Sequence, residues 1–97
     1  MAGVSSVMLV IPRRANLPET DARELLRRLE SLGSDRGAIN AVARIRFALS
    51  DGQEQILTAT EAASVHNAVL SWLAEEAELD PQLRERLERL ERATARV

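Results

Sequence analysis

Five consecutive apolar residues, VMLVI at positions 7–11, constrain the fold of this chain more than any other feature. A run this short and this rich in β-branched side chains is typical of a strand that is buried on both faces. Such a strand needs neighbouring strands and covering helices. Because 97 residues provide only one hydrophobic core, we expect a single domain over residues 1–97.

Three segments have the periodicity of amphipathic helices. Residues 16–33 carry leucines three and four positions apart. Residues 58–79 begin with Thr58 and Glu61 at the spacing of a capping box, in which each residue satisfies a backbone amide near the helix start, although Thr60 is an equally good candidate for the cap. Residues 80–97 begin with Asp-Pro, and both residues favour a helix N-terminus.

Residues 38–50, AINAVARIRFALS, alternate between two sets of side chains, and this alternation predicts a strand. In that strand Ile45 and Phe47 would point into the core. Asp51-Gly52 then predicts a tight hairpin turn, because both positions tolerate positive φ. The predicted fold is α+β, in the order β-α-β-β-α-α. It has a three-stranded mixed sheet, helices on one face and a C-terminal amphipathic helix.

The composition removes several classes of enzyme. The chain has no cysteine and no lysine, so it cannot use a thiolate nucleophile, a Schiff base or the lysine of a phosphate-binding loop. Its one histidine, His66, has no serine three or four residues away on the same predicted helix. We therefore expect no catalytic residues, no metal site and no cofactor, and we interpret His66 as a partly buried residue at a helix edge.

The C-terminal helix presents a stripe of leucines that must be buried against something. Leu83, Leu87 and Leu90 are four and three positions apart, and the remaining positions are mostly charged. Trp72, the only tryptophan, shares a face with Val65 and Val69 and is an anchor either for the core or for an interface. We predict that Leu83, Leu87, Leu90 and Trp72 bind a partner.

Charge is unevenly distributed along the chain, whose net charge is −2. Residues 1–50 carry eight arginines and five acids, whereas residues 51–97 carry five arginines and ten acids. If they converge, four arginines of the first half could bind anions such as phosphate: Arg13, Arg14, Arg44 and Arg46. The negative net charge and the lack of aromatic residues beside these arginines weigh against a nucleic-acid partner.

The leading functional hypothesis is a non-catalytic protein–protein interaction module, acting as a homodimer, an adaptor or a regulatory subunit. The first alternative is a regulator that binds nucleic acid through an arginine face, and the second is a small-molecule-binding domain at a dimer interface. The apolar run near the N-terminus is too short to span a bilayer, and its basic residues follow it, unlike those of a signal peptide. We therefore expect a cytoplasmic protein without a membrane partner, and the arginine- and alanine-rich composition suggests a bacterial source.

Overall fold

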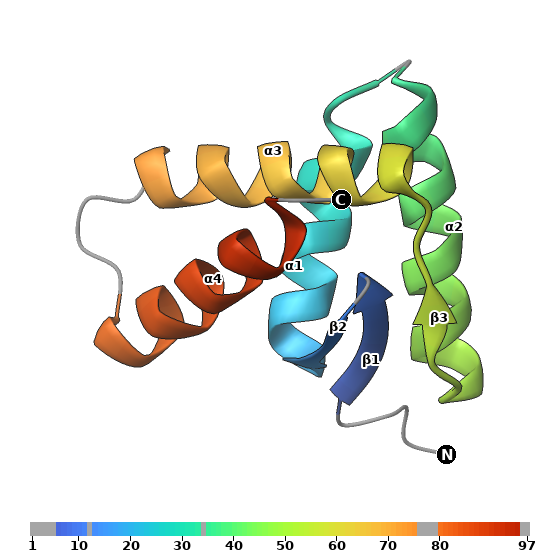
Figure 1. Cartoon of the computed structure of the whole chain (residues 1–97), viewed down its shortest axis with the longest axis horizontal. Helices are drawn as coiled ribbons and strands as arrows, with labels where there is room; N and C mark the ends of the chain where they lie inside the picture. The colour runs from blue at the N-terminus through green and yellow to red at the C-terminus, as the bar shows by residue number, and fades with distance from the viewer. Residues whose placement is uncertain (1–5, 12, 34, 76–79, 96–97) are drawn as a thin grey trace.

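The chain begins with two strands and two helices: β1 (Ser6–Ile11), β2 (Arg13–Pro18), α1 (Glu19–Glu30) and α2 (Arg36–Asp51). A short strand and two further helices follow: β3 (Gln55–Ile56), α3 (Ala59–Glu75) and α4 (Pro81–Thr94) (Figure 1). The computed structural model describes residues 6–11, 13–33, 35–75 and 80–95. Of residues 11 and 13 it describes the backbone but not the side chain. The predicted α+β class and three-stranded mixed sheet are confirmed, but the element order is β-β-α-α-β-α-α.

The sheet has β1 in its centre, in the order β2-β1-β3. β1 pairs with β2 in antiparallel fashion, with Val7 opposite Leu17, and with β3 in parallel, with Val10 opposite Ile56. Pro12 and the residues after it predict a loop over positions 13–16, before the predicted helix, and this prediction is wrong. Residues 13–16 belong to β2, an edge strand, where polar side chains can remain in water.

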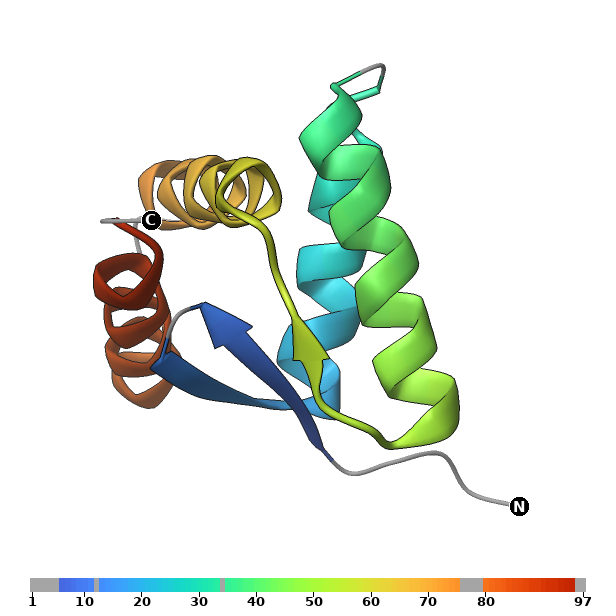
Figure 2. The same cartoon turned by 45° about the vertical axis from the view of Figure 1, so that its right-hand side comes forward.

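The two faces of the sheet have different surroundings. The helices cover the face on which three apolar side chains are buried: Val7, Leu9 and Leu17. On the opposite face Met8 is only half-buried and Ile56 is 66% exposed. Figure 2 shows α1 and α2 packed side by side next to the sheet, with α4 beside β2. Within the run, the described side chains of residues 7–10 are therefore fully buried on one face only.

The predicted strand at residues 38–50 is wrong, because these residues form most of helix α2. Five apolar side chains of this helix are buried at spacings of three and four: Ala38, Ala41, Ile45, Ala48 and Leu49. The segment therefore fits both a period of two and a helical period. Its many alanines favour the helix, since alanine has the highest helix propensity.

Asp51-Gly52 ends this helix and does not form the predicted hairpin. Gly52 has φ 77°, and its amide N–H donates to the Ala48 carbonyl at 2.9 Å. A left-handed glycine suits the C-terminus of a helix as well as a hairpin turn, so the dipeptide predicts the change of direction but not its type. The chain then enters β3, which pairs with β1.

The predicted starts of the last two helices are confirmed. The Thr58 hydroxyl accepts from the Glu61 amide at 3.2 Å, and Glu61 Oε1 accepts from the Thr58 amide at 2.9 Å. Asp80 accepts from the amides of Gln82 and Leu83 at 3.1 and 3.2 Å, and Pro81 follows it. These local contacts fix where α3 and α4 begin.

The N-terminus of α2 is packed tightly against the first turn of α3. Asp35 caps α2 by accepting from the Ala38 amide at 3.0 Å, and the Ser64 hydroxyl donates to the same carboxylate at 2.6 Å. Gly37 lies at this contact, where a Cβ atom would meet the Ser64 hydroxyl and would lie 2.7 Å from the Thr60 carbonyl oxygen. Only glycine allows the two helices to approach this closely.

We therefore expect Gly37→Ala to destabilise the protein by about 1–3 kcal/mol, because the added methyl group must displace backbone. The sign of the change in the free energy of unfolding is informative, since glycine to alanine in an unobstructed helix stabilises by up to about 1 kcal/mol. Urea denaturation followed by circular dichroism measures the difference. A stabilised Gly37→Ala variant would mean that α2 and α3 do not meet at Gly37.

Candidate functional site

The predicted partner-binding stripe of the C-terminal helix lies mostly inside the protein. Leu87 and Leu90 are 1% and 3% exposed and belong to the chain's own core, and Leu83 is half-buried against that core. Trp72 is 4% exposed, and the Arg28 guanidinium lies 5.0 Å from the centre of its ring. Of the four residues predicted to bind a partner, three are therefore buried in the chain's own core and Leu83 packs at its edge, because α4 packs on α3 and β2 of the same chain.

His66 joins α3 to the end of α4. Its Nδ1 atom lies 3.0 Å from the Thr94 hydroxyl and 3.1 Å from the Glu91 carbonyl oxygen. Both partners belong to the framework of α4, and within the described part of the chain His66 forms no hydrogen bond or ion pair with a carboxylate. The interpretation of His66 as a half-buried residue at a helix edge is confirmed.

The arginines proposed to bind an anion do not form one cluster. Arg44 and Arg46 would share a face in a strand, but two positions on a helix are about 200° apart. Arg44 binds Glu61 with a 2.7 Å ion pair, Arg46 pairs with Glu30 of α1, and Arg14 pairs with a glutamate near β3. The side chain of Arg13 lies outside the described residues.

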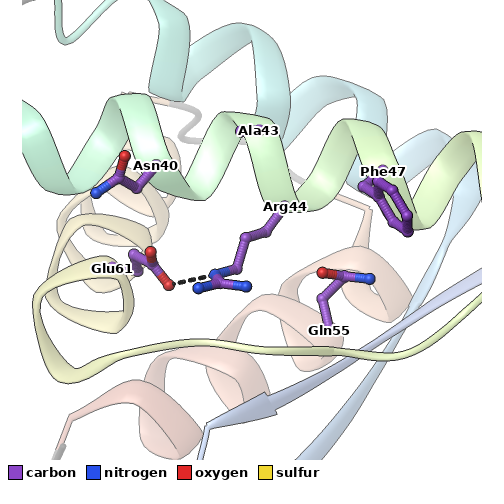
Figure 3. A pocket seen from close by; sticks show the side chains of 6 residues that line it. All are labelled: Asn40, Ala43, Arg44, Phe47, Gln55 and Glu61. Atoms are coloured by element: carbon purple, nitrogen blue, oxygen red, sulfur yellow. Dashed lines mark hydrogen bonds and ion pairs between the residues drawn. The ribbon is translucent and has the colours of Figure 1, made fainter.

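A groove with a volume of about 410 Å³ lies between α2 and the segment that leads through β3 into α3 (Figure 3). Six residues line it: Asn40, Ala43, Arg44, Phe47, Gln55 and Glu61. The buried carboxylate of Glu61 accepts from Arg44 Nε and from the Thr58 amide, so these two side chains are fixed in place. Asn40 and Gln55 add amide groups that can both donate and accept hydrogen bonds.

Phe47 borders this groove and is the most informative residue of the site. It is the only phenylalanine of the chain, and it is 51% exposed instead of buried as the strand prediction requires. Ile39, on the same side of α2, is 53% exposed, and the exposed Ala43 lies between them. We call Ile39, Ala43 and Phe47 the α2 stripe. Its spacing of four residues is visible in the sequence, but only a helical reading of residues 36–51 places the three side chains together.

Opposite charges lie at the two ends of the α2 stripe. Arg36 is exposed at the first residue of α2 and Asp51 is exposed at the last. Within the described part of the chain neither side chain forms an ion pair with another residue. The surface therefore has an apolar middle, a positive end and a negative end.

The groove and the α2 stripe provide apolar surface and hydrogen-bonding groups. The six residues that line the groove include no serine, threonine or histidine that could act as a nucleophile or as its base. Glu61, the only carboxylate among them, is already occupied by Arg44 and by the start of α3. The described residues contain no group of three or more His, Cys, Asp or Glu placed to hold a metal ion.

No protein-family model, no curated protein and no solved structure matches this chain. Among the helices described, none is both long enough and apolar enough to cross a bilayer.

Proposed function

We propose that the protein is a non-catalytic interaction module that pairs with a second copy of itself through the α2 stripe. The observation that supports this most is the exposure of Phe47 and Ile39 in a chain with only two aromatic residues. Aromatic side chains are enriched at interfaces, because they bury a large area for little conformational entropy. The second copy is favoured over an unrelated partner because the α2 stripe is complementary to itself.

The self-complementarity follows from the positions along the helix. Ile39 and Phe47 are each four residues from Ala43. When two copies of α2 cross in antiparallel fashion about a two-fold axis at Ala43, each Ile39 meets the Phe47 of the other copy. The small side chain of Ala43 lets the two helices approach, and each Phe47 ring enters the groove beside Asn40 of the other copy.

The charged ends fit the same arrangement. Arg36 lies seven residues before Ala43 and Asp51 lies eight residues after it. In the antiparallel pair, each Arg36 is close to the Asp51 of the other copy, so the dimer contains two such ion pairs. The antiparallel orientation also places the positive end of each helix dipole beside the negative end of the other.

The other exposed apolar surface, the outer face of the sheet, is less suitable. There the charged side chains of Arg14 and Glu54 lie 3.6 Å apart across β1, so an apolar partner on that face would have to desolvate both charges. The sheet face is therefore the alternative that the experiments on the α2 stripe must distinguish.

The test exploits the two charges at the ends of the stripe. Arg36→Asp alone places two acids beside each other at both ends of the dimer, and Asp51→Arg alone places two arginines there. Each variant is expected to associate more weakly than the unmodified protein, whereas an equimolar mixture restores two opposite-charge pairs per dimer. Sedimentation velocity at low ionic strength measures all three samples, since added salt screens these pairs.

A mixture that associates better than either variant alone supports the antiparallel pairing, because no other surface requires Arg36 to meet Asp51. A mixture that behaves as the average of its two components overturns it. Circular dichroism of each variant provides the control for folding, and both positions are exposed, so little change in stability is expected.

A further inference from the structure

A second cavity, with a volume of about 390 Å³, lies between the edge strand β2 and helix α4. It shares no lining residue with the groove beside α2. One wall is formed by residues 14–18 of β2. The other is formed by four residues on one face of α4, with spacings of three, one and three positions: Arg86, Arg89, Leu90 and Ala93. Its volume is in the range of cavities that bind small molecules.

The charge of this cavity is opposite to that of the whole chain. Arg14, Arg86 and Arg89 all line it, and the described residues that line it include no acid. The chain as a whole has a net charge of −2. A positive cavity on a negative protein indicates a preference for an anionic ligand.

Arg86 is held in a fixed orientation by a buried acid. Its Nε and Nη2 atoms donate to the two carboxylate oxygens of Asp21 at 2.7 and 3.2 Å, and the Asp21 side chain is only 6% exposed. These hydrogen bonds raise the pKa of Arg86, which remains cationic. Among the described residues none forms a hydrogen bond with Nη1 of Arg86, so this nitrogen can still donate to a ligand.

Arg14 and Arg89 are held only loosely. Arg89 lies 3.7 Å from Glu85, Arg14 lies 3.6 Å from Glu54, and all four side chains are largely exposed. Exposed pairs at such distances contribute little to stability, so an incoming anion can replace either glutamate. The fixed Arg86 and the exchangeable Arg89 come from the same face of α4.

The remaining lining is apolar. Leu17 and Leu90 are buried beside the cavity, and Ala15 and Ala93 are small side chains on its two walls. A ligand that fits both parts has an anionic head for the arginines and an aliphatic body for the leucines and alanines. We propose that the cavity between β2 and α4 binds a small aliphatic carboxylic acid, with its carboxylate on Arg86 and Arg89.

Octanoate is a suitable probe, and octan-1-ol is its neutral counterpart. Titration of the full chain with octanoate is expected to change the backbone amide resonances of β2 and of the lining face of α4, with calorimetry giving the affinity. Octan-1-ol is expected to bind at least about tenfold more weakly, since it lacks the charge-assisted hydrogen bonds.

Arg89→Gln is expected to weaken octanoate binding by about tenfold and to leave the fold intact, because Arg89 is exposed. Arg92→Gln is the matched control: it removes the same charge from the next turn of α4, outside the cavity, and should bind octanoate like the unmodified protein. Ala93→Leu fills the cavity and should abolish binding. The proposal is overturned if octanoate does not bind, if octanol binds equally well, or if Arg89→Gln and Arg92→Gln weaken binding equally.

Discussion

Replacing Leu87 by aspartate is expected to unfold the protein. Leu87 is 1% exposed and belongs to the core that α4 shares with α3 and the sheet. Loss of a buried leucine costs about 2–5 kcal/mol, and burial of a carboxylate adds several kcal/mol more. The total approaches the whole stability of a small domain, which is about 5–15 kcal/mol.

Thermal unfolding followed by circular dichroism measures this effect. Gln82→Asp introduces the same side chain at an exposed position of α4 and should melt close to the unmodified protein. The sequence alone favours another result, a folded monomer, because it predicts that the leucines of this helix face a partner. If Leu87→Asp melts at the same temperature as Gln82→Asp, this result would contradict the packing of α4 on its own chain that the structure shows.

Replacing Phe47 by aspartate is expected to separate folding from association. At 51% exposure the Phe47 ring contributes little to the core, so the free energy of unfolding should change by no more than about 0.5 kcal/mol. In the proposed dimer the ring is buried twice, once in each copy. If each loss costs about 2 kcal/mol, as at an interface hot spot, the association constant should fall about a thousandfold.

Leu70→Asp is the matched control for Phe47→Asp. Leu70 is 44% exposed on α3, outside the α2 stripe, and the substitution introduces the same charge. Sedimentation of the two variants should show a monomer for Phe47→Asp and an unchanged dimer for Leu70→Asp. A large loss of stability in Phe47→Asp would instead indicate that Phe47 is buried in the core, as the strand prediction requires.

Short-range signals in the sequence predict much of the fold. The apolar run at positions 7–11 is a strand, and the capping residues Thr58 and Asp80 mark where α3 and α4 begin. The two capping signals act through hydrogen bonds within a few residues, whereas the apolar run predicts a strand without indicating which segments pair with it. The α+β class and a three-stranded mixed sheet are predicted correctly, although the predicted strand at residues 38–50 is part of helix α2 and strand β2 is not predicted.

The features that sequence reasoning missed depend on contacts between distant segments. Residues 38–50 fit the periods of a strand and of a helix, and packing against α1 and α3, together with the alanine content of the segment, selects the helix. For the same reason the stripe containing Leu87 could face either the core or a partner. The candidate site is not predicted because residues 38–50 are interpreted as a strand with a period of two. That period places Phe47 in the core and places Arg44 and Arg46 on one face.

The measurement that tests the proposed function most directly is sedimentation equilibrium of the unmodified protein from low micromolar to near-millimolar concentration. We predict a reversible equilibrium between monomer and dimer, with the dimer lost in Phe47→Asp and retained in Ile56→Asp, which alters the outer face of the sheet. A protein that remains monomeric over the whole range would contradict self-association. A dimer that survives Phe47→Asp and dissociates in Ile56→Asp would place the interface on the sheet instead of on α2.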